Sequence, residues 1–157
     1  EDVVKDFRLL GYENNILSSD DYEDNTTDAG EIGTGFTLSL CFEIGLKEDV
    51  DLSQDLDIAK VNIRYKDAKS TPEDTSSELD LPIKSQCYTT DLSQDDKFVA
   101  SVVEFALILL GSKYKADADI DNVIERLQSI EFDDEYKTQF VQVVNTYKVN
   151  SSSTSLR

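Results

Sequence analysis

The clearest pattern along the chain is a strict alternation of apolar and polar residues from residue 36 to residue 44. The apolar positions are Phe36, Leu38, Leu40, Phe42 and Ile44, and the positions between them are Thr37, Ser39, Cys41 and Glu43. A period of two residues is typical of a strand with one covered face and one wetter face. We therefore predict a strand over Phe36–Ile44, with Cys41 on its more polar face.

Three further segments of the first half carry strand patterns, namely Val4–Tyr12, Ile58–Lys66 and Leu79–Lys84. Pro82 lacks a backbone N–H, which favours a sheet edge or a strand end for the last segment. The polar and acidic residues between 13 and 28 predict a loop or a short helical excursion. The first half thus predicts about four antiparallel strands.

A helix is predicted over Phe98–Leu110, because these thirteen residues carry a single charge, Glu104. A helix that is apolar all round belongs in a core, so we expect it to be buried on all sides. Ser93 followed by Asp96 has the form of a capping box, and Gly111 suits the left-handed turn that ends a helix. The segment is too short to cross a bilayer.

Two more helices follow. Asp119 can cap the first, whose apolar positions at helical spacing are Ile120, Val123, Ile124, Leu127 and Ile130. The second runs from about Asp134 to Tyr147, and its apolar stripe consists of Tyr136, Phe140, Val143, Val144 and Tyr147. Residues 149–157 lack an apolar pattern, and we expect a flexible tail there.

Strands followed by helices predict an α+β domain. We expect about four antiparallel strands in one half-sandwich-like sheet, packed against about three helices, in a single domain over residues 1–148. Four strands in an open sheet leave an edge, which we place near Pro82 or along Val4–Tyr12. We expect strands from elsewhere in the polypeptide to extend the sheet there, so that this chain alone has a long unpaired edge.

Charge and composition exclude several functions. With 33 acidic and 15 basic side chains, the 157 residues carry a net charge of −18. Nucleic acid and anionic membrane surfaces would be repelled. The sequence has no His, which excludes a Ser-His-Asp or Cys-His enzyme within these residues. Without a Met or an apolar leader near residue 1, we expect a fragment or mature segment of a longer polypeptide.

Metal binding has weak candidates only. The acidic residues Asp20, Asp21, Glu23, Asp24 and Asp28, with Glu31 nearby, could chelate calcium, although a solvated acidic loop is the usual role of such a cluster. Asp117, Asp119 and Asp121 have the spacing of a calcium loop, but its Gly and its bidentate Glu are replaced. No catalytic or cofactor-binding residue is predicted.

Three other motifs have structural explanations. The pentapeptide Asp-Leu-Ser-Gln-Asp occurs at residues 51–55 and 91–95, where the second copy caps the long apolar helix. The glycine-rich residues 30–35 precede a strand and not a helix, so we expect a turn with positive φ and not a phosphate loop. Cys41 and Cys87 have no metal-ligand spacing, and the sequence leaves open whether they pair.

Several stretches, in order, resemble the C-terminal domain of YfbK-like von Willebrand factor type A proteins, a bacterial family. They are FRLLGYEN from Phe7, DAGEIGTGFTLSLCFEI from Asp28, IRYK from Ile63, FVASVVEFALILLGSKY from Phe98 and DDEYKTQFVQVV from Asp133. The chain departs from the family at Phe36, where His is usual, at Cys41 and Phe42, and at Leu110-Gly111. The family has no catalytic residues to carry over.

The resemblance implies a context. Such a domain follows a von Willebrand A module in a protein exported to the bacterial cell envelope, so the expected location is extracytoplasmic. We expect a non-enzymatic structural or interaction domain whose partners are that module, the N-terminal segment of the same protein and other envelope proteins. The alternatives are a calcium-binding module that uses the acidic 20–31 loop, and an accessory domain that regulates a partner enzyme.

Overall fold

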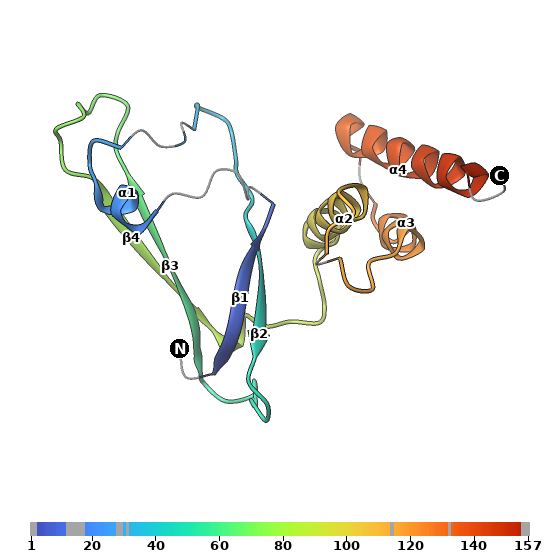
Figure 1. The fold of residues 1–157 in the computed structure, drawn as a ribbon, viewed down its shortest axis with the longest axis horizontal. Coiled ribbons are helices and arrows are strands. Elements are labelled where there is room, and N and C mark those ends of the chain that lie inside the picture. Colours follow the sequence, from blue (N-terminus) through green and yellow to red (C-terminus); the bar gives the residue numbers. More distant parts are fainter. Residues whose placement is uncertain are drawn as a thin grey trace. The chain divides into compact units, whose positions relative to one another are not determined.

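The computed structural model describes residues 3–11, 18–27, 30, 32–113, 115–131 and 133–154. Its elements, in order, are β1 (Val4–Leu10), α1 (Ser19–Glu23), β2 (Cys41–Leu46), β3 (Asp57–Tyr65), β4 (Ser77–Lys84), η2 (Ser85–Cys87), α2 (Gln94–Leu109), α3 (Ile120–Gln128) and α4 (Glu135–Thr154). The chain divides into two compact units, Glu1–Thr89 with the strands and Thr90–Arg157 with the three long helices (Figure 1). The predicted α+β class is confirmed, and the packing of strands against helices stays a prediction.

The predicted single sheet is wrong. The described strands form two separate antiparallel sheets of two strands each, β1–β2 and β3–β4. The start of β3 is tied to the end of β4, because Leu56 N donates to Ser85 Oγ over 3.1 Å and Ser85 N donates to Leu56 O over 2.9 Å. These long-range bonds lie directly beyond the ladder pair Asp57–Lys84.

The strand predicted at Phe36–Ile44 is displaced towards the C-terminus, since β2 runs from Cys41 to Leu46. Its ladder begins at the pair Leu10–Cys41, where β1 ends. Gly11 follows with a φ of 80°, a left-handed conformation outside the strand region. The segment 36–40 therefore meets no ladder partner from β1. Tyr12, the predicted end of the first strand, lies outside the described residues.

Each sheet separates apolar from polar residues. In β1–β2, Phe7 faces Ile44 and Leu9 faces Phe42, while Arg8 faces Glu43 on the other side. In β3–β4 the apolar pairs are Val61–Leu81 and Ile63–Leu79, and the polar face carries Lys60, Asn62, Arg64, Glu78 and Asp80. The alternation predicted for these strands is confirmed. Pro82 lies in β4, which pairs on one side only within the described residues.

The capping predictions for the helical unit are confirmed. Ser93 is the N-cap of α2 and accepts from Asp96 N over 3.1 Å. At the other end Gly111 has a φ of 56° and donates to Ile108 O, and Ser112 N donates to Leu107 O over 3.0 Å, which is a Schellman motif. Asp119 caps α3. These signals involve neighbours only a few residues apart.

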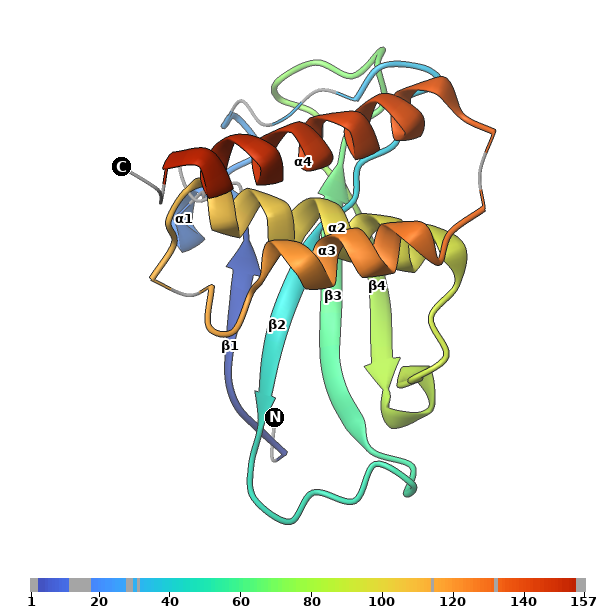
Figure 2. The same ribbon diagram turned by 90° about the vertical axis from the view of Figure 1, so that its right-hand side faces the viewer.

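The three helices enclose one core (Figure 2). Its fully buried apolar side chains are Phe105, Val123, Leu127 and Val144. Edge-to-face aromatic pairs connect α2 with α4, with ring centroids 5.8 Å apart for Phe105–Phe140 and 5.4 Å apart for Phe105–Tyr147. None of the described helices has the length and apolar character that a membrane crossing requires.

The helical unit by itself covers α2 on one side only, and the burial of α2 on all sides stays a prediction. Ser101 and Phe105 are buried, but Val102, Leu109 and Leu110 are exposed, the last of them to 72%. Positions 102, 106 and 109 follow helical spacing on a second face, beside the one that meets α3 and α4. The helix therefore has two apolar faces, because its sequence is apolar all round, and the core of its own unit covers one of them.

The single charge of the apolar segment is compensated. Glu104 Oε2 lies 2.8 Å from Arg126 Nη1, and Glu104 Oε1 accepts from Asp119 N over 3.2 Å. The Glu104 carboxylate is mostly covered, and a covered charge is stable only when it is paired. This ion pair joins α2 to α3 beside the core.

The last helix continues further than predicted. α4 ends at Thr154 and not near Tyr147, so residues 149–154 are helical where a flexible tail was expected. Ser151 Oγ donates to Tyr147 O over 2.6 Å, so this side chain bonds within the helix instead of competing with it. An apolar stripe is thus not required for these turns. Residues 155–157 lie outside the described residues.

Candidate functional site

The most prominent surface feature of the first unit is a row of apolar side chains along residues 36–44. We call it the β2 strip, and it consists of Phe36, Leu38, Leu40, Phe42 and Ile44. Their exposed fractions run from 77% at Phe36 to 36% at Ile44. Phe7, the cross-strand neighbour of Ile44, is also exposed. Contiguous exposed apolar side chains of this kind mark interaction surfaces.

The opposite side of the same strand is polar. Glu43 forms an ion pair with Arg8 from β1, and Cys41 lies two residues from Glu43 on the same side, as predicted. Cys41 and Cys87 are unpaired thiols, the second of them exposed in η2. A partner that meets residues 36–46 therefore finds one apolar and one polar face.

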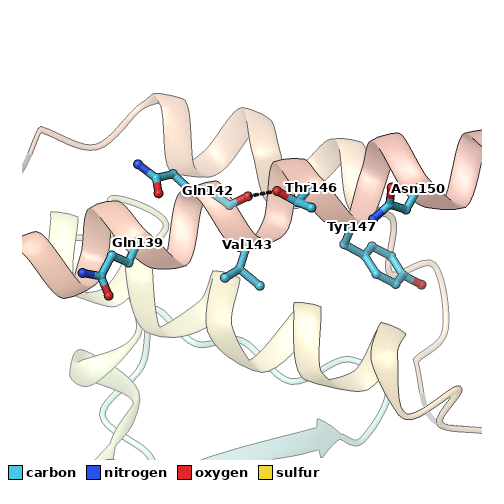
Figure 3. Close-up of a pocket in the computed structure, with 6 residues that line it drawn as sticks. All are labelled: Gln139, Gln142, Val143, Thr146, Tyr147 and Asn150. Carbon is cyan, nitrogen blue, oxygen red and sulfur yellow. Dashed lines mark hydrogen bonds between the residues drawn. The ribbon is translucent and has the colours of Figure 1, made fainter.

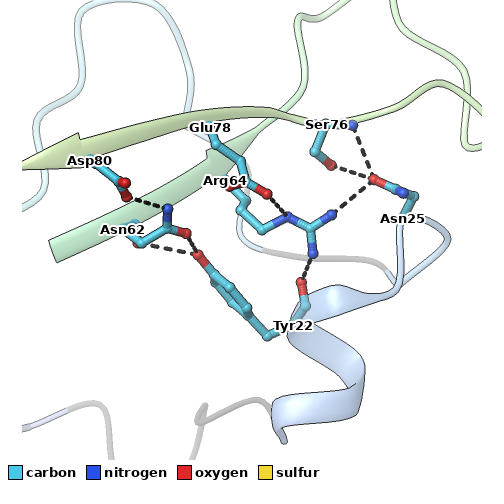
Figure 4. A network of polar contacts seen from close by, with 7 residues as sticks. All are labelled: Tyr22, Asn25, Asn62, Arg64, Ser76, Glu78 and Asp80. Atoms are coloured by element: carbon cyan, nitrogen blue, oxygen red, sulfur yellow. Dashed lines mark hydrogen bonds and ion pairs between the residues drawn. The ribbon is translucent and has the colours of Figure 1, made fainter.

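The β3–β4 sheet has a second exposed apolar face, formed by Val61, Ile63, Leu79 and Leu81. Its polar face is covered in part by the segment around α1, through a network centred on Arg64 (Figure 4). The guanidinium donates to Tyr22 O and, over 3.1 Å, to Asn25 Oδ1, and its Nε lies 3.3 Å from Glu78 Oε1. It also lies over the Tyr22 ring, 5.4 Å from the centroid.

Asn25 completes this network. Its Oδ1 also accepts from Ser76 N over 3.0 Å and from Ser76 Oγ over 2.8 Å, and its backbone carbonyl accepts from Lys66 Nζ over 2.6 Å. Beyond it, Tyr22 Oη donates to Asn62, and Asn62 Nδ2 donates to Asp80 Oδ1 over 2.6 Å. The network fastens residues 22–25 to a sheet some forty positions later in the chain. The role of the network is structural. The sequence did not predict it, because no local pattern relates residues so far apart in the chain.

Two of the acidic residues considered for calcium binding, Asp21 and Asp24, have local hydrogen-bond partners. Asp21 Oδ2 accepts from Ser18 Oγ at the start of α1, over 2.6 Å. Asp24 Oδ1 accepts from Thr26 N and Thr26 Oγ1, each over 2.8 Å, and these bonds lower the pKa of Asp24 below its usual value. Asp20 is an exposed residue in the first turn of α1. Asp28 and Glu31 lie outside the described residues.

Among the described residues, no group of three or more acidic, Cys or His side chains is arranged to hold a metal ion. Two of the three carboxylates of the other candidate loop also have structural roles. Asp119 accepts from Asp121 N over 2.6 Å as the α3 cap, and Asp121 pairs with Lys148 of α4. A calcium ion would have to displace these bonds.

We therefore expect calcium to leave the thermal midpoint of the chain unchanged. A ligand at about 100 times its dissociation constant stabilises a fold by about 2.7 kcal/mol, which shifts the midpoint by several degrees. Scanning calorimetry measures the thermal midpoint in calcium at about 1 mM, in the same concentration of magnesium and in a chelator. A calcium-specific upward shift that is lost in Asp20→Asn or Asp28→Asn would contradict this expectation.

The two copies of the repeated pentapeptide have different structural roles, one in a turn and one in a helix cap. In the first copy, Asp51 Oδ1 accepts from Ser53 Oγ over 2.7 Å and from Ser53 N over 3.0 Å, and these bonds lower the pKa of Asp51. In the second copy, Ser93 caps α2, as predicted. In the glycine-rich turn, Gly35 has the expected positive φ, at 83°.

A shallow groove lies along α4 (Figure 3). Its lining consists of Gln139, Gln142, Val143, Thr146, Tyr147 and Asn150. Thr146 Oγ1 donates back to Gln142 O over 2.8 Å, so this hydroxyl bonds within the helix. One helix supplies the whole lining, which contains amides and hydroxyls but no ionisable group other than the Tyr147 phenol.

Comparison with known proteins places the chain in a family. Residues 2–149 match the family described as "Uncharacterized protein YfbK, C-terminal". The uncharacterized protein YfbK of Escherichia coli strain K12 is 26% identical over 159 residues, which cover 90% of this chain and 27% of that protein. No solved structure matches. Since the family match covers nearly the whole chain, this chain belongs to the family of YfbK C-terminal domains.

Proposed function

We propose that this chain is a non-enzymatic interaction domain that holds other parts of its own, longer polypeptide through the β2 strip. The observation that carries the proposal is the exposure of five alternating apolar side chains along residues 36–44. Apolar side chains at alternate positions are a costly feature to expose unless something covers them.

The setting of the proposal is a bacterial cell-envelope protein with a von Willebrand A module, outside the cytoplasm. Support for a longer polypeptide comes from the Escherichia coli relative, because this chain spans only 27% of its length. Support for the A module and for export comes from the family resemblance of the sequence. Other envelope proteins are further partners in this proposal.

A binding role without catalysis also agrees with the side-chain chemistry. The sequence contains no His, and four carboxylates of the two candidate loops, those of Asp21, Asp24, Asp119 and Asp121, take part in local hydrogen bonds or an ion pair. The net charge of −18 favours neutral or basic partners.

The proposal can be tested in the longer polypeptide by inserting a protease site directly before residue 1. After cleavage, we expect the two parts to co-elute in size-exclusion chromatography at micromolar concentration, as a dissociation constant of about 1 μM or tighter requires. Replacing Phe36 and Leu38 together by Ser should separate them. Tyr136→Ser, which changes an aromatic residue exposed to 82% on α4, is the matched control. Separation of the cleaved wild-type parts would contradict the proposed function.

A further inference from the structure

Residues 36–40 combine the strongest strand pattern of the sequence with the absence of a ladder partner. Phe36, Leu38 and Leu40 alternate with Thr37 and Ser39, yet within the described residues this segment belongs to neither sheet. It leads directly into β2 (Figure 1). Phe36 N donates to Gly33 O over 3.1 Å, which closes a turn at the start of the segment.

The ladder stops here because β1 is too short to continue it. Within the described residues the last pair is Leu10–Cys41, and Gly11 after it has a positive φ. Along Phe36–Leu46 the chain thus offers strand-forming residues over eleven positions, of which β1 pairs only the last six. At about 3.3 Å per residue this is an edge of roughly 36 Å, longer than a typical strand of a globular protein.

We propose that residues 36–46 accept an added β-strand from a segment of the same polypeptide that lies outside these 157 residues. This inference rests on the proposed function and specifies its binding mode. The added strand would use the backbone N–H and C=O groups of 36–40 and of the outer edge of β2, and it would lay its apolar side chains beside the β2 strip.

The occupant follows from length and charge. The match covers only 27% of the relative, so the relative is several times longer than this chain. A polypeptide of that length has many other segments that could supply a strand. A tethered segment is present at an effective concentration in the millimolar range, which favours it over a free partner. A second copy of this chain would bring another net charge of −18 to the same edge. The segment we expect alternates apolar with neutral or basic residues, the basic ones near Glu43.

Hydrogen–deuterium exchange compares the longer polypeptide with the 157-residue chain. We expect the amides of residues 36–40 to exchange at least about 10-fold more slowly in the longer polypeptide, because strand pairing protects them. The control is β4, whose free side carries Pro82 and whose exchange should be the same in both. Equal exchange of residues 36–40 in both proteins would overturn the inference, even if the cleaved parts co-elute.

A proline scan in the longer polypeptide separates strand addition from simple apolar contact. Thr37, Leu38, Ser39 and Leu40 are each replaced by Pro and, as the matched control, by Ala. In a strand, the N–H groups of every second residue point to the same neighbouring strand. Proline should therefore strongly reduce amide protection at two alternate positions, where it removes an N–H that bonds to the added strand, and only weakly at the two positions between them. Uniform loss at all four positions would overturn strand addition while leaving the proposed function intact.

A second copy as the occupant would give a different result. The amides of residues 36–40 would then be protected in the 157-residue chain itself, in a concentration-dependent manner, and light scattering would report a dimer. That result would overturn the assignment to a segment of the same polypeptide.

Discussion

Phe105→Ala should lower the free energy of unfolding of the helical unit by about 3 to 5 kcal/mol, the usual cost of truncating a buried Phe. Phe105 is 4% exposed and contacts two other aromatic rings from α4, Phe140 and Tyr147. The substitution removes the ring that both of them pack against and leaves a cavity between α2 and α4. Urea denaturation followed by helical circular dichroism measures the loss.

The matched control is Tyr136→Ala, which truncates another aromatic side chain of the helical unit. The Tyr136 ring is 82% exposed on α4, so its removal should change the free energy of unfolding by no more than about 0.5 kcal/mol. If the two variants were equally stable, the core assigned to the helical unit would be wrong.

Arg64→Met should release the segment around α1 from the β3–β4 sheet and cost about 2 kcal/mol, a typical contribution of hydrogen bonds to a charged group. The Arg64 side chain is only 14% exposed and connects Tyr22 O, Asn25 Oδ1 and Glu78. Methionine has a similar length but no donors. Hydrogen exchange of residues 18–27 should accelerate, and the midpoint of denaturation should fall.

Arg64→Lys should fail to restore stability, because one ammonium group cannot reproduce the planar fork that reaches three acceptors. Lys60→Met is the control on the same face of β3. Lys60 pairs with Asp80 over 3.2 Å, but both side chains are more than half exposed, so we expect no measurable change. A Lys60→Met variant as unstable as Arg64→Met would show that charge alone, and not the network geometry, fastens the segment.

The two predictions concern different units of the chain, so they also test whether the units unfold together. If Phe105→Ala lowers the midpoint for the helices without changing exchange in residues 57–65, each unit unfolds by itself. A common midpoint would show that the strands and the helices stabilise one another.

The candidate site was predictable in part. The alternation correctly placed Phe42 and Ile44 on one face of β2, and Cys41 with Glu43 on the other. The sequence could not predict that the described ladder of β1 and β2 leaves out residues 36–40, because this depends on where β1 ends, about thirty residues earlier in the chain. For the same reason, an alternating pattern cannot show whether its apolar face is covered.

What the sequence determined by itself is local. Ser93, Asp119 and Gly111 mark helix ends through hydrogen bonds to neighbours a few residues away, so these ends were predicted correctly. The order of strands and helices, and therefore the α+β class, follows from periodicities within single segments.

What only the tertiary structure decided is long-range. Leu56 and Ser85, which are 29 positions apart, are joined by hydrogen bonds beside the β3–β4 ladder, and the Arg64 network joins residues about 40 positions apart. Within the helical unit, α3 and α4 cover only the face of α2 around Phe105, so a second apolar face of α2 lies outside the core of that unit. In each case the free energy comes from a partner whose position in space is set by the rest of the chain, and no pattern within the segment itself records that partner.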